Sequence, residues 1–208
     1  NRAGAGGQIA ADYVKGQPGD GLTLLLGTAH MMVMVPLTSK TVKYDAARDF
    51  KAVARISSFH EGVSLPISAP ANTLAQWLET ARADPKSASY GVPAPGSIPQ
   101  FIGYQLGLLT KTSLVPVPYR GTAPLTQDLL GGQIPAGILP IADMAQYSGS
   151  RVKILAVNGT KRSERLPNVP TLRELGYTQF DALEWSGIFL PASASRATVL
   201  QVQGALAK

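Results

Sequence analysis

Short apolar runs alternate with helix-like segments along most of the chain. The expected strands are residues 22–26, 50–56, 63–68, 89–92, 114–118, 134–139, 152–157 and 180–190. Helices are expected at residues 8–17, 73–82, 140–147, 171–175 and 195–207, with Thr73 as the N-cap of the second. Two further helices are expected after glycine-containing turns. This alternation predicts an α/β protein with mainly parallel sheets that carry helices on both faces.

The stretch Pro118–Gly132 predicts a strand end, a glycine turn and a short helix closed by two glycines. Thr122 or Ala123 lies where an N-cap is expected, and Pro124 suits the first helical turn because its missing N–H costs nothing there. Either glycine at the end can take the left-handed conformation that ends helices. Free N–H groups and the helix dipole at such a turn favour an anion, although an ordinary strand-to-helix connection is the alternative interpretation.

A second stretch of the same kind spans Tyr90–Gln100. Ser97 is a good N-cap, and Pro99 falls in the first turn of the helix that follows. The apolar face of that helix is expected to consist of Phe101, Ile102, Leu106 and Leu109. Two helix N-termini about one supersecondary unit apart indicate a shared anion pocket.

The continuously apolar run 22–26 is typical of a strand buried on both faces of a parallel sheet. It ends at Gly27–His30, which we expect to be a loop at the carboxyl edge of the sheet, where ligands bind in open α/β folds. His30 is interpreted as a polar residue of this ligand loop. The methionines that follow are interpreted as adaptable packing, in a position to line a pocket.

Composition excludes several classes of protein. The chain has no cysteine and two histidines, so thiol chemistry and a zinc site are not expected, and we expect no metal or cofactor. Its net charge of +6 comes from scattered residues, which does not indicate a nucleic-acid reader but is compatible with attraction of anionic ligands. No run reaches the roughly 20 apolar residues needed to span a bilayer, and no signal peptide is recognisable at residue 1.

Taken together, the motifs resemble those of one family, the periplasmic solute-binding receptors of tripartite tricarboxylate transporters, or Bug-type receptors. The matching segments, in chain order, are Asn1–Gly7, Asp20–Leu25, Tyr44–Asp45, Asp49–Phe50, Pro118–Gly121, Asp128–Gln133, Leu155–Val157, Arg162–Ser163, Leu166–Thr171, Glu174–Tyr177 and Trp185–Gly187. Each segment alone is weakly specific. Their common order across almost the whole chain makes the resemblance specific.

The resemblance implies a two-lobed, Venus-flytrap binding protein of the type II-like class, with no enzymatic activity. One lobe would comprise residues 1–60 and 180–208, the other residues 61–179, with crossing strands near Ser57–Ser58 and Phe180–Asp181. Such receptors are periplasmic and monomeric, capture a small organic acid or amino-acid-like ligand between their lobes, and deliver it to a membrane permease. A signal peptide, a first strand and a Pro-Phe-x-x-Gly-Gly loop are expected upstream, so both ends are expected to be truncated and the first lobe incomplete.

The expected ligand-facing residues come from the three loops and one further acidic position. They are Gly27, Thr28, Ala29, His30, Ala94, Gly96, Ser97, Tyr119, Arg120, Gly121, Thr122, Ala123 and Asp143. Backbone N–H groups, the hydroxyls of the serine and threonines, and bridging waters would hold the ligand. Arg120 is a candidate carboxylate partner because of its planar fork, and an orientation toward solvent is the alternative.

Two other functions remain open from the residues. A ligand-sensing effector domain of a transcriptional regulator has the same two-lobed fold, but no helix-turn-helix segment is recognisable in this sequence. An enzyme would use His30 with Asp45 or Asp143 as acid and base, and no spacing pairs these residues.

Overall fold

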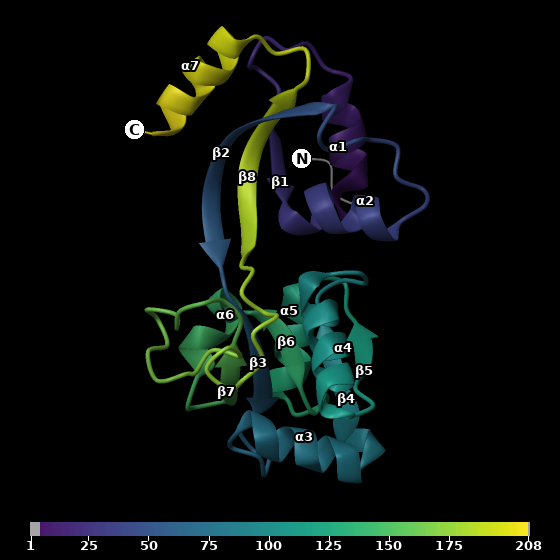
Figure 1. Cartoon of the computed structure of the whole chain (residues 1–208), viewed down its shortest axis with the longest axis vertical. Helices are drawn as coiled ribbons and strands as arrows, with labels where there is room; N and C mark the ends of the chain where they lie inside the picture. Colours follow the sequence, from purple (N-terminus) through teal and green to yellow (C-terminus); the bar gives the residue numbers. More distant parts are fainter. Residues whose placement is uncertain (1–4, 208) are drawn as a thin grey trace. The chain divides into compact units, whose positions relative to one another are not determined.

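The computed structural model describes residues 5–207 and divides the chain into two compact units (Figure 1). The first unit is Asn1–Ser58 with Glu184–Lys208, and the second is Phe59–Leu183. The chain therefore passes between the units twice, at residues 58–59 and 183–184. The lobe limits expected from the sequence were residues 60 and 180. Residues 1–4, which begin the first family motif, lie outside the described residues.

The first unit contains a three-stranded sheet with the order β1-β8-β2. Its strands are β1 (Leu25–Thr28), β2 (Phe50–Phe59) and β8 (Glu184–Pro191). Its helices are η1 (Ala5–Gly7), α1 (Gln8–Lys15), the π-helical η2 (His30–Met34), α2 (Val35–Thr38) and α7 (Arg196–Leu206). Residues of α1, β1, η2 and β2 share one buried cluster in this unit.

The prediction for residues 22–26 was wrong. The strand begins only at Leu25 and pairs antiparallel with β8, with Thr28 opposite Ser186. Its side chains alternate between core and solvent: Leu25 is buried, whereas Leu26 is 59% exposed. An antiparallel strand buried on one face has this pattern. The predicted loop at Gly27–His30 is also absent from the described chain, because β1 continues through Thr28 and the helical segment begins at once.

The second unit contains a five-stranded sheet with the order β5-β4-β6-β3-β7. Its strands are β3 (Glu61–Pro66), β4 (Ser89–Val92), β5 (Val115–Pro118), β6 (Gly137–Pro140) and β7 (Val152–Val157). Its helices are α3 (Leu74–Ala83), η3 (Pro85–Ala88), α4 (Ile98–Thr110), α5 (Thr122–Leu130), α6 (Ile141–Met144) and η4 (Ala145–Tyr147). The sheet is mixed: β4 is parallel to β5 and β6, whereas β3 is antiparallel to β6 and β7.

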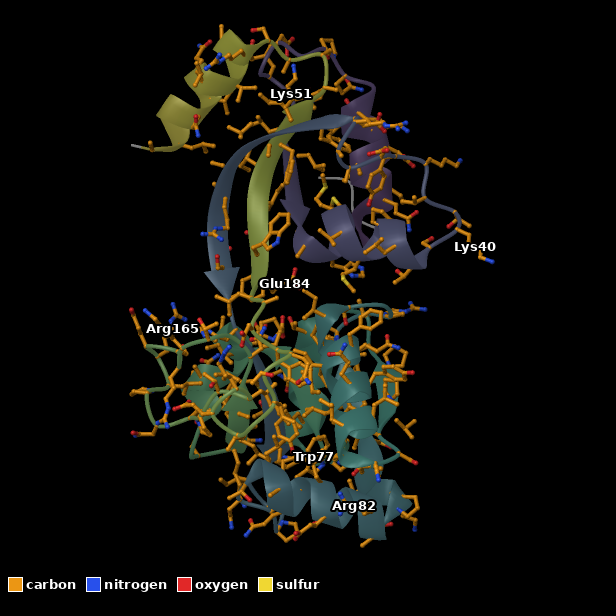
Figure 2. All side chains as sticks on the ribbon, viewed as in Figure 1. Lys40, Lys51, Trp77, Arg82, Arg165 and Glu184 are labelled. Carbon is orange, nitrogen blue, oxygen red and sulfur yellow. The ribbon has the colours of Figure 1, made fainter. Side chains whose placement is uncertain are left out.

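Helices cover both faces of this second sheet, as the sequence predicted. On one face, Trp77 of α3 and Leu106 of α4 pack in a cluster with Ile138 of β6 (Figure 2). On the other face, Leu125 of α5 packs in a separate cluster with Leu139. Adjacent residues of β6 thus enter opposite cores, which is the alternation of a strand buried on both faces.

Several local details differ from the sequence prediction. The segment 171–175 forms hydrogen-bonded turns instead of a helix, in which the Glu174 carboxylate accepts from the Thr171 N–H at 2.7 Å. Leu109, expected on the buried face of α4, is 47% exposed. Among the described residues, no helix is long and apolar enough to cross a membrane.

Candidate ligand-binding site

Three strands of the second unit end at the same edge of its sheet. Because β4 lies between β5 and β6 and runs parallel to both, Val92, Pro118 and Pro140 all lie at this edge. The connections that follow carry most of the predicted ligand-binding residues: Ala94, Gly96, Ser97, Tyr119, Arg120, Gly121, Thr122, Ala123 and Asp143. The structure therefore brings these residues of the second unit to one sheet edge. We call this edge the carboxyl edge.

Two backbone hydrogen bonds join the loops that follow β4 and β5. The Tyr119 N–H donates to the Val92 carbonyl, and the Gly121 N–H donates to the Pro93 carbonyl, each at 2.8 Å. Gly121 has a φ of +104°, a conformation that residues with a side chain rarely adopt. The glycine therefore lets the second loop turn beside the first and enter α5.

The N-terminus of α5 points open donors at the carboxyl edge. Gly121 is the N-cap, whereas Thr122 or Ala123 was predicted, and Pro124 is the third helical residue. Having no side chain, Gly121 cannot accept from the first-turn N–H groups of Thr122 and Ala123. At the C-terminal end of α5, the backbone of Gly132 is in the left-handed conformation with φ +68°, whereas that of Gly131 is in the right-handed helical conformation. The uncapped first turn and the helix dipole together favour an anion.

The N-terminus of α4 is organised differently. Ser97 is the N-cap, as predicted, but its hydroxyl donates to the Ala94 carbonyl at 2.7 Å and its side chain is buried. The Gly96 N–H donates to Gln100 Oε1 at 2.7 Å. Both predicted ligand donors thus hold the loop in shape. Gln100 was missed by the sequence analysis, although its position three residues after the N-cap is that of a capping box.

Tyr119 also has an internal partner. Its hydroxyl donates to Asp128 Oδ2 of α5 at 2.8 Å. Burial and then this hydrogen bond to a carboxylate raise the pKa of Tyr119 to about 12. Arg120, the next residue, is exposed, and Asp143 is half-buried in α6. Arg120 thus has a charged group accessible to solvent, whereas the Tyr119 phenol is engaged by α5.

In the first unit, the four predicted residues 27–30 are held by groups of the chain itself. Thr28 Oγ1 accepts from the Met31 N–H at 3.2 Å. Glu184, which opens β8, is buried, and its Oε1 accepts from the His30 N–H at 3.3 Å (Figure 2). Burial raises the pKa of Glu184, while hydrogen bonds from the N–H groups of His30, Trp185 and Ala29 act in the opposite direction. Sequence analysis missed Glu184, whose only signal was an acidic residue within the predicted strand 180–190.

Within residues 5–207, no group of three or more histidines, aspartates and glutamates could hold a metal ion. Asp45, considered as an acid or base, accepts through Oδ1 from the Ala47 and Arg48 N–H groups at 2.9 and 3.1 Å. These are the hydrogen bonds of a turn.

Comparison with known proteins identifies the same family that the order of the sequence motifs predicted. The family model described as tripartite tricarboxylate transporter family receptor matches residues 1–208. The chain is 30% identical over 210 residues to the "UPF0065 protein in tcbD-tcbE intergenic region" of Pseudomonas sp. (strain P51), covering all of this chain and 62% of that protein. It is 29% identical over 193 residues to "Protein BugT" of Bordetella pertussis, covering 92% of this chain and 59% of BugT. The chain thus spans about three-fifths of these relatives.

Solved structures agree on the fold, which is that of a two-lobed periplasmic binding protein. R. palustris Rpa4515 with adipate has a TM-score of 0.91 at 30% identity, covering 100% of this chain and 70% of that one. Periplasmic binding protein BugD has a TM-score of 0.86 at 27% identity, and the match covers 99% of this chain and 69% of the BugD chain. MatC (Rpa3494) from Rhodopseudomonas palustris with bound malate has a TM-score of 0.86 at 25% identity. The match covers 98% of this chain and 70% of the MatC chain. The chain therefore belongs to the family of tripartite tricarboxylate transporter receptors.

Proposed function

We propose that this chain acts as an extracytoplasmic solute-binding receptor for a small carboxylate, which it delivers to a membrane permease of the tripartite tricarboxylate type. The observation that carries the proposal is the uncapped N-terminus of α5 beside the loop that follows β4. Adipate and malate in two solved relatives support the ligand class, and the periplasmic receptors among the relatives support the location.

One carboxylate group of the ligand is proposed to bind at the carboxyl edge. Its oxygens would accept from the N–H groups of Thr122 and Ala123, where the helix dipole stabilises negative charge. Arg120 would add a charge-assisted pair, for which its planar guanidinium is suited. The loop that follows β4 would line the other side of the site with Ala94, Gly96 and Ser97. Water would bridge the ligand to the remaining N–H and hydroxyl donors of these two loops.

Binding is proposed to involve no chemical step. Family receptors bind and release their solute, and hinge motion at the two chain crossings would accompany capture. The residues 27–30 are proposed as the contribution of the first unit. The overall charge of +6 would favour encounter with anions.

A thermal-shift screen of the full-length mature protein tests this function. The panel contains monocarboxylates, dicarboxylates, tricarboxylates, amino acids and aromatic acids, with the matching alcohols and amides as uncharged controls. A ligand at about a thousand times its dissociation constant adds about 4 kcal/mol to the free energy of unfolding. Stabilisation by one acid class supports the receptor. A folded protein that no carboxylate stabilises would refute it.

A carboxyl-edge variant then locates the site. Arg120→Gln removes the proposed charged partner, and Arg196→Gln, at the first residue of α7 in the first unit, is the matched control. The first substitution is expected to weaken binding by about tenfold or more, because a charge-assisted hydrogen bond is lost. The control is expected to leave the affinity unchanged.

A further inference from the structure

One buried side chain of the second unit holds the two segments by which the chain enters and leaves this unit. The chain enters at Phe59 and leaves after Leu183. Asn158, the residue directly after β7, is 1% exposed. Its Oδ1 accepts from the Glu61 N–H at 2.7 Å, and its Nδ2 donates to the Ala182 carbonyl. All these groups belong to the second unit, so the bridge is internal to it.

A carboxamide is the group that fits these two partners. A backbone N–H can only donate and a backbone carbonyl can only accept, so the bridging side chain needs an acceptor and a donor. An ionised aspartate at position 158 would accept from the Glu61 N–H but would have no donor for the Ala182 carbonyl. A leucine of similar volume would have neither. The two backbone partners therefore select an amide at this position.

Backbone hydrogen bonds hold the turn after β7 beside the same two segments. The Asn158 N–H donates to the Glu61 carbonyl at 3.1 Å, and the Gly159 N–H donates to the Phe180 carbonyl at 2.7 Å. Gly159 has a φ of +99°, and a Cβ at this position would lie 2.9 Å from Leu183 Cδ2. This close packing places the Asn158 amide against both of its partners.

A second bridge between the same two paths of the chain lies in the first unit. Ser57 Oγ of β2 and Ser186 Oγ of β8 are hydrogen-bonded at 2.7 Å. Between this serine pair and the Asn158 amide, the two paths consist of residues 58–60 and 183–185, and both unit boundaries fall within them. Hinges are a few residues that absorb a change of φ and ψ, and these two short stretches have the position expected of them.

We propose that Asn158 is a hinge-positioning residue, whose amide ties the two crossing segments together in the second unit, so that both bend as one element and only within residues 58–60 and 183–185. Two segments that bend separately would allow the units to twist as well as to open. A tied pair allows fewer arrangements, so less conformational entropy is lost when a ligand is captured. This consequence for capture rests on the proposed function, whereas the tie itself does not.

Spin labels measure the spread of arrangements in the full-length protein without ligand. The chain has no cysteine, so Lys40→Cys in the first unit and Glu79→Cys in α3 of the second give two labelling sites without a competing thiol. Both positions are exposed. Pulsed electron paramagnetic resonance gives the distribution of distances between the labels. Asn158→Ala in this labelled background is expected to broaden the distribution, because the two crossing segments then bend independently.

The matched control removes another bridging amide of the second unit. Asn72 Oδ1 accepts from Lys153 Nζ at 2.8 Å, and Lys153 lies at the start of β7, whereas Asn158 follows its end. Asn72→Ala thus breaks a bridge away from the crossings and is expected to leave the distribution unchanged. Asn158→Asp keeps the acceptor for the Glu61 N–H and loses the donor, so it should also broaden the distribution. This variant decides the question if Asn158→Ala does not fold.

Hydrogen exchange separates a hinge role from a purely local one. The Glu61 N–H is expected to exchange about tenfold faster in Asn158→Ala, because its acceptor is lost. Faster exchange with an unchanged distance distribution would show that the amide supports only the local fold, and would refute the hinge role. Equal broadening in Asn72→Ala would refute it as well. No ligand is added, so these outcomes are independent of the carboxylate screen, whose failure would refute the receptor function alone.

Discussion

The Tyr119 hydroxyl donates a 2.8 Å hydrogen bond to Asp128 Oδ2 and so ties the loop that follows β5 to the helix that this loop enters. Tyr119 is also one of the residues predicted to contact the ligand. Its phenol braces α5, whose first turn is the proposed anion site. The residue thus acts on the site through the orientation of the helix.

The Tyr119–Asp128 pair gives a titration prediction. The pKa of Tyr119 is raised to about 12 by burial and by Asp128. Asp128→Asn removes the negative charge, so the pKa of Tyr119 is expected to fall. Ultraviolet titration of tyrosinate, with Tyr119→Phe as the control that removes the signal, measures this change. An unchanged titration in Asp128→Asn would contradict the role of the pair.

The same shift has a consequence for stability at high pH. The folded-state pKa of Tyr119 lies above its model value of 10.0. The stabilisation linked to this group is therefore complete below about pH 10 and is lost as the pH rises toward 12. Tyr119→Phe is expected to lower the free energy of unfolding by about 1 kcal/mol at neutral pH and to remove this part of the alkaline loss. Urea unfolding across the alkaline range measures both effects.

A pair of glycines separates binding from folding. Gly121 and Gly132 flank α5, both have positive φ, and a Cβ at either would meet no atom within 4 Å. Gly121→Val and Gly132→Val are each expected to lose about 1–3 kcal/mol of stability from backbone strain. Only Gly121→Val should lose ligand affinity, because Gly121 lies at the carboxyl edge and positions the first-turn N–H groups. Calorimetric titration and chemical unfolding of both variants test this, and equal affinities would remove Gly121 from the site.

The Arg162–Glu174 ion pair predicts an acid-dependent contribution to stability. Arg162 Nε lies 3.0 Å from both carboxylate oxygens of Glu174, and Arg162 Nη2 lies 3.0 Å from Oε1. The Arg162 hydrogen bonds, followed by the Thr171 N–H, lower the pKa of Glu174 to about 2. The linked stabilisation is present above the ordinary pKa of 4.5 and is lost as the pH falls toward 2.

Glu174→Gln is expected to flatten that acid limb of the stability curve. Unfolding of wild type and variant at several pH values between about 6 and 2 tests the expectation. Asp20→Asn, in an exposed turn of the first unit, is the control. A variant curve parallel to wild type would show that the pair does not contribute to the pH dependence.

The N-cap of α3 provides a stability test in the second unit alone. Thr73 Oγ1 accepts from the Gln76 N–H at 3.2 Å. Thr73→Ala should lower stability by about 1 kcal/mol, because it leaves a first-turn donor without its side-chain partner. Thr80→Ala on the same helix is the control, since the Thr80 hydroxyl donates to a carbonyl that the helix can already use. A loss no larger than that of the control would refute the capping contribution.

Local signals in the sequence predicted a large part of the fold. Strands 89–92 and 152–157 have the predicted limits, and Thr73 and Ser97 occupy their predicted N-cap positions. These features depend on a few neighbouring residues, such as a turn followed by an apolar run. The order of short motifs also predicted the family that the comparison confirmed.

The wrong predictions came from segments whose environment is set by distant residues. The apolar run at 22–26 is typical of a strand buried on both faces. Leu26 is nevertheless exposed, because other elements of the fold cover only one face of β1. The segment 171–175 has a helix-like sequence, yet an isolated parallel bridge holds Thr171 opposite Val157. Tertiary pairing overrides local preference in short segments, because a few residues have little intrinsic helical stability.

Residue order was sufficient to specify the α/β class, the family and the turns that carry the proposed ligand-binding residues. It could not specify which donors in those turns remain available. Glu184 reaches the His30 N–H across 154 positions, Gln100 Oε1 accepts from Gly96, and the Tyr119 hydroxyl is taken by Asp128. A donor is available only if no other group of the folded chain reaches it within hydrogen-bonding distance. That competition is decided by the tertiary structure, which leaves the uncapped start of α5 as the proposed anion site and engages the His30 N–H with Glu184.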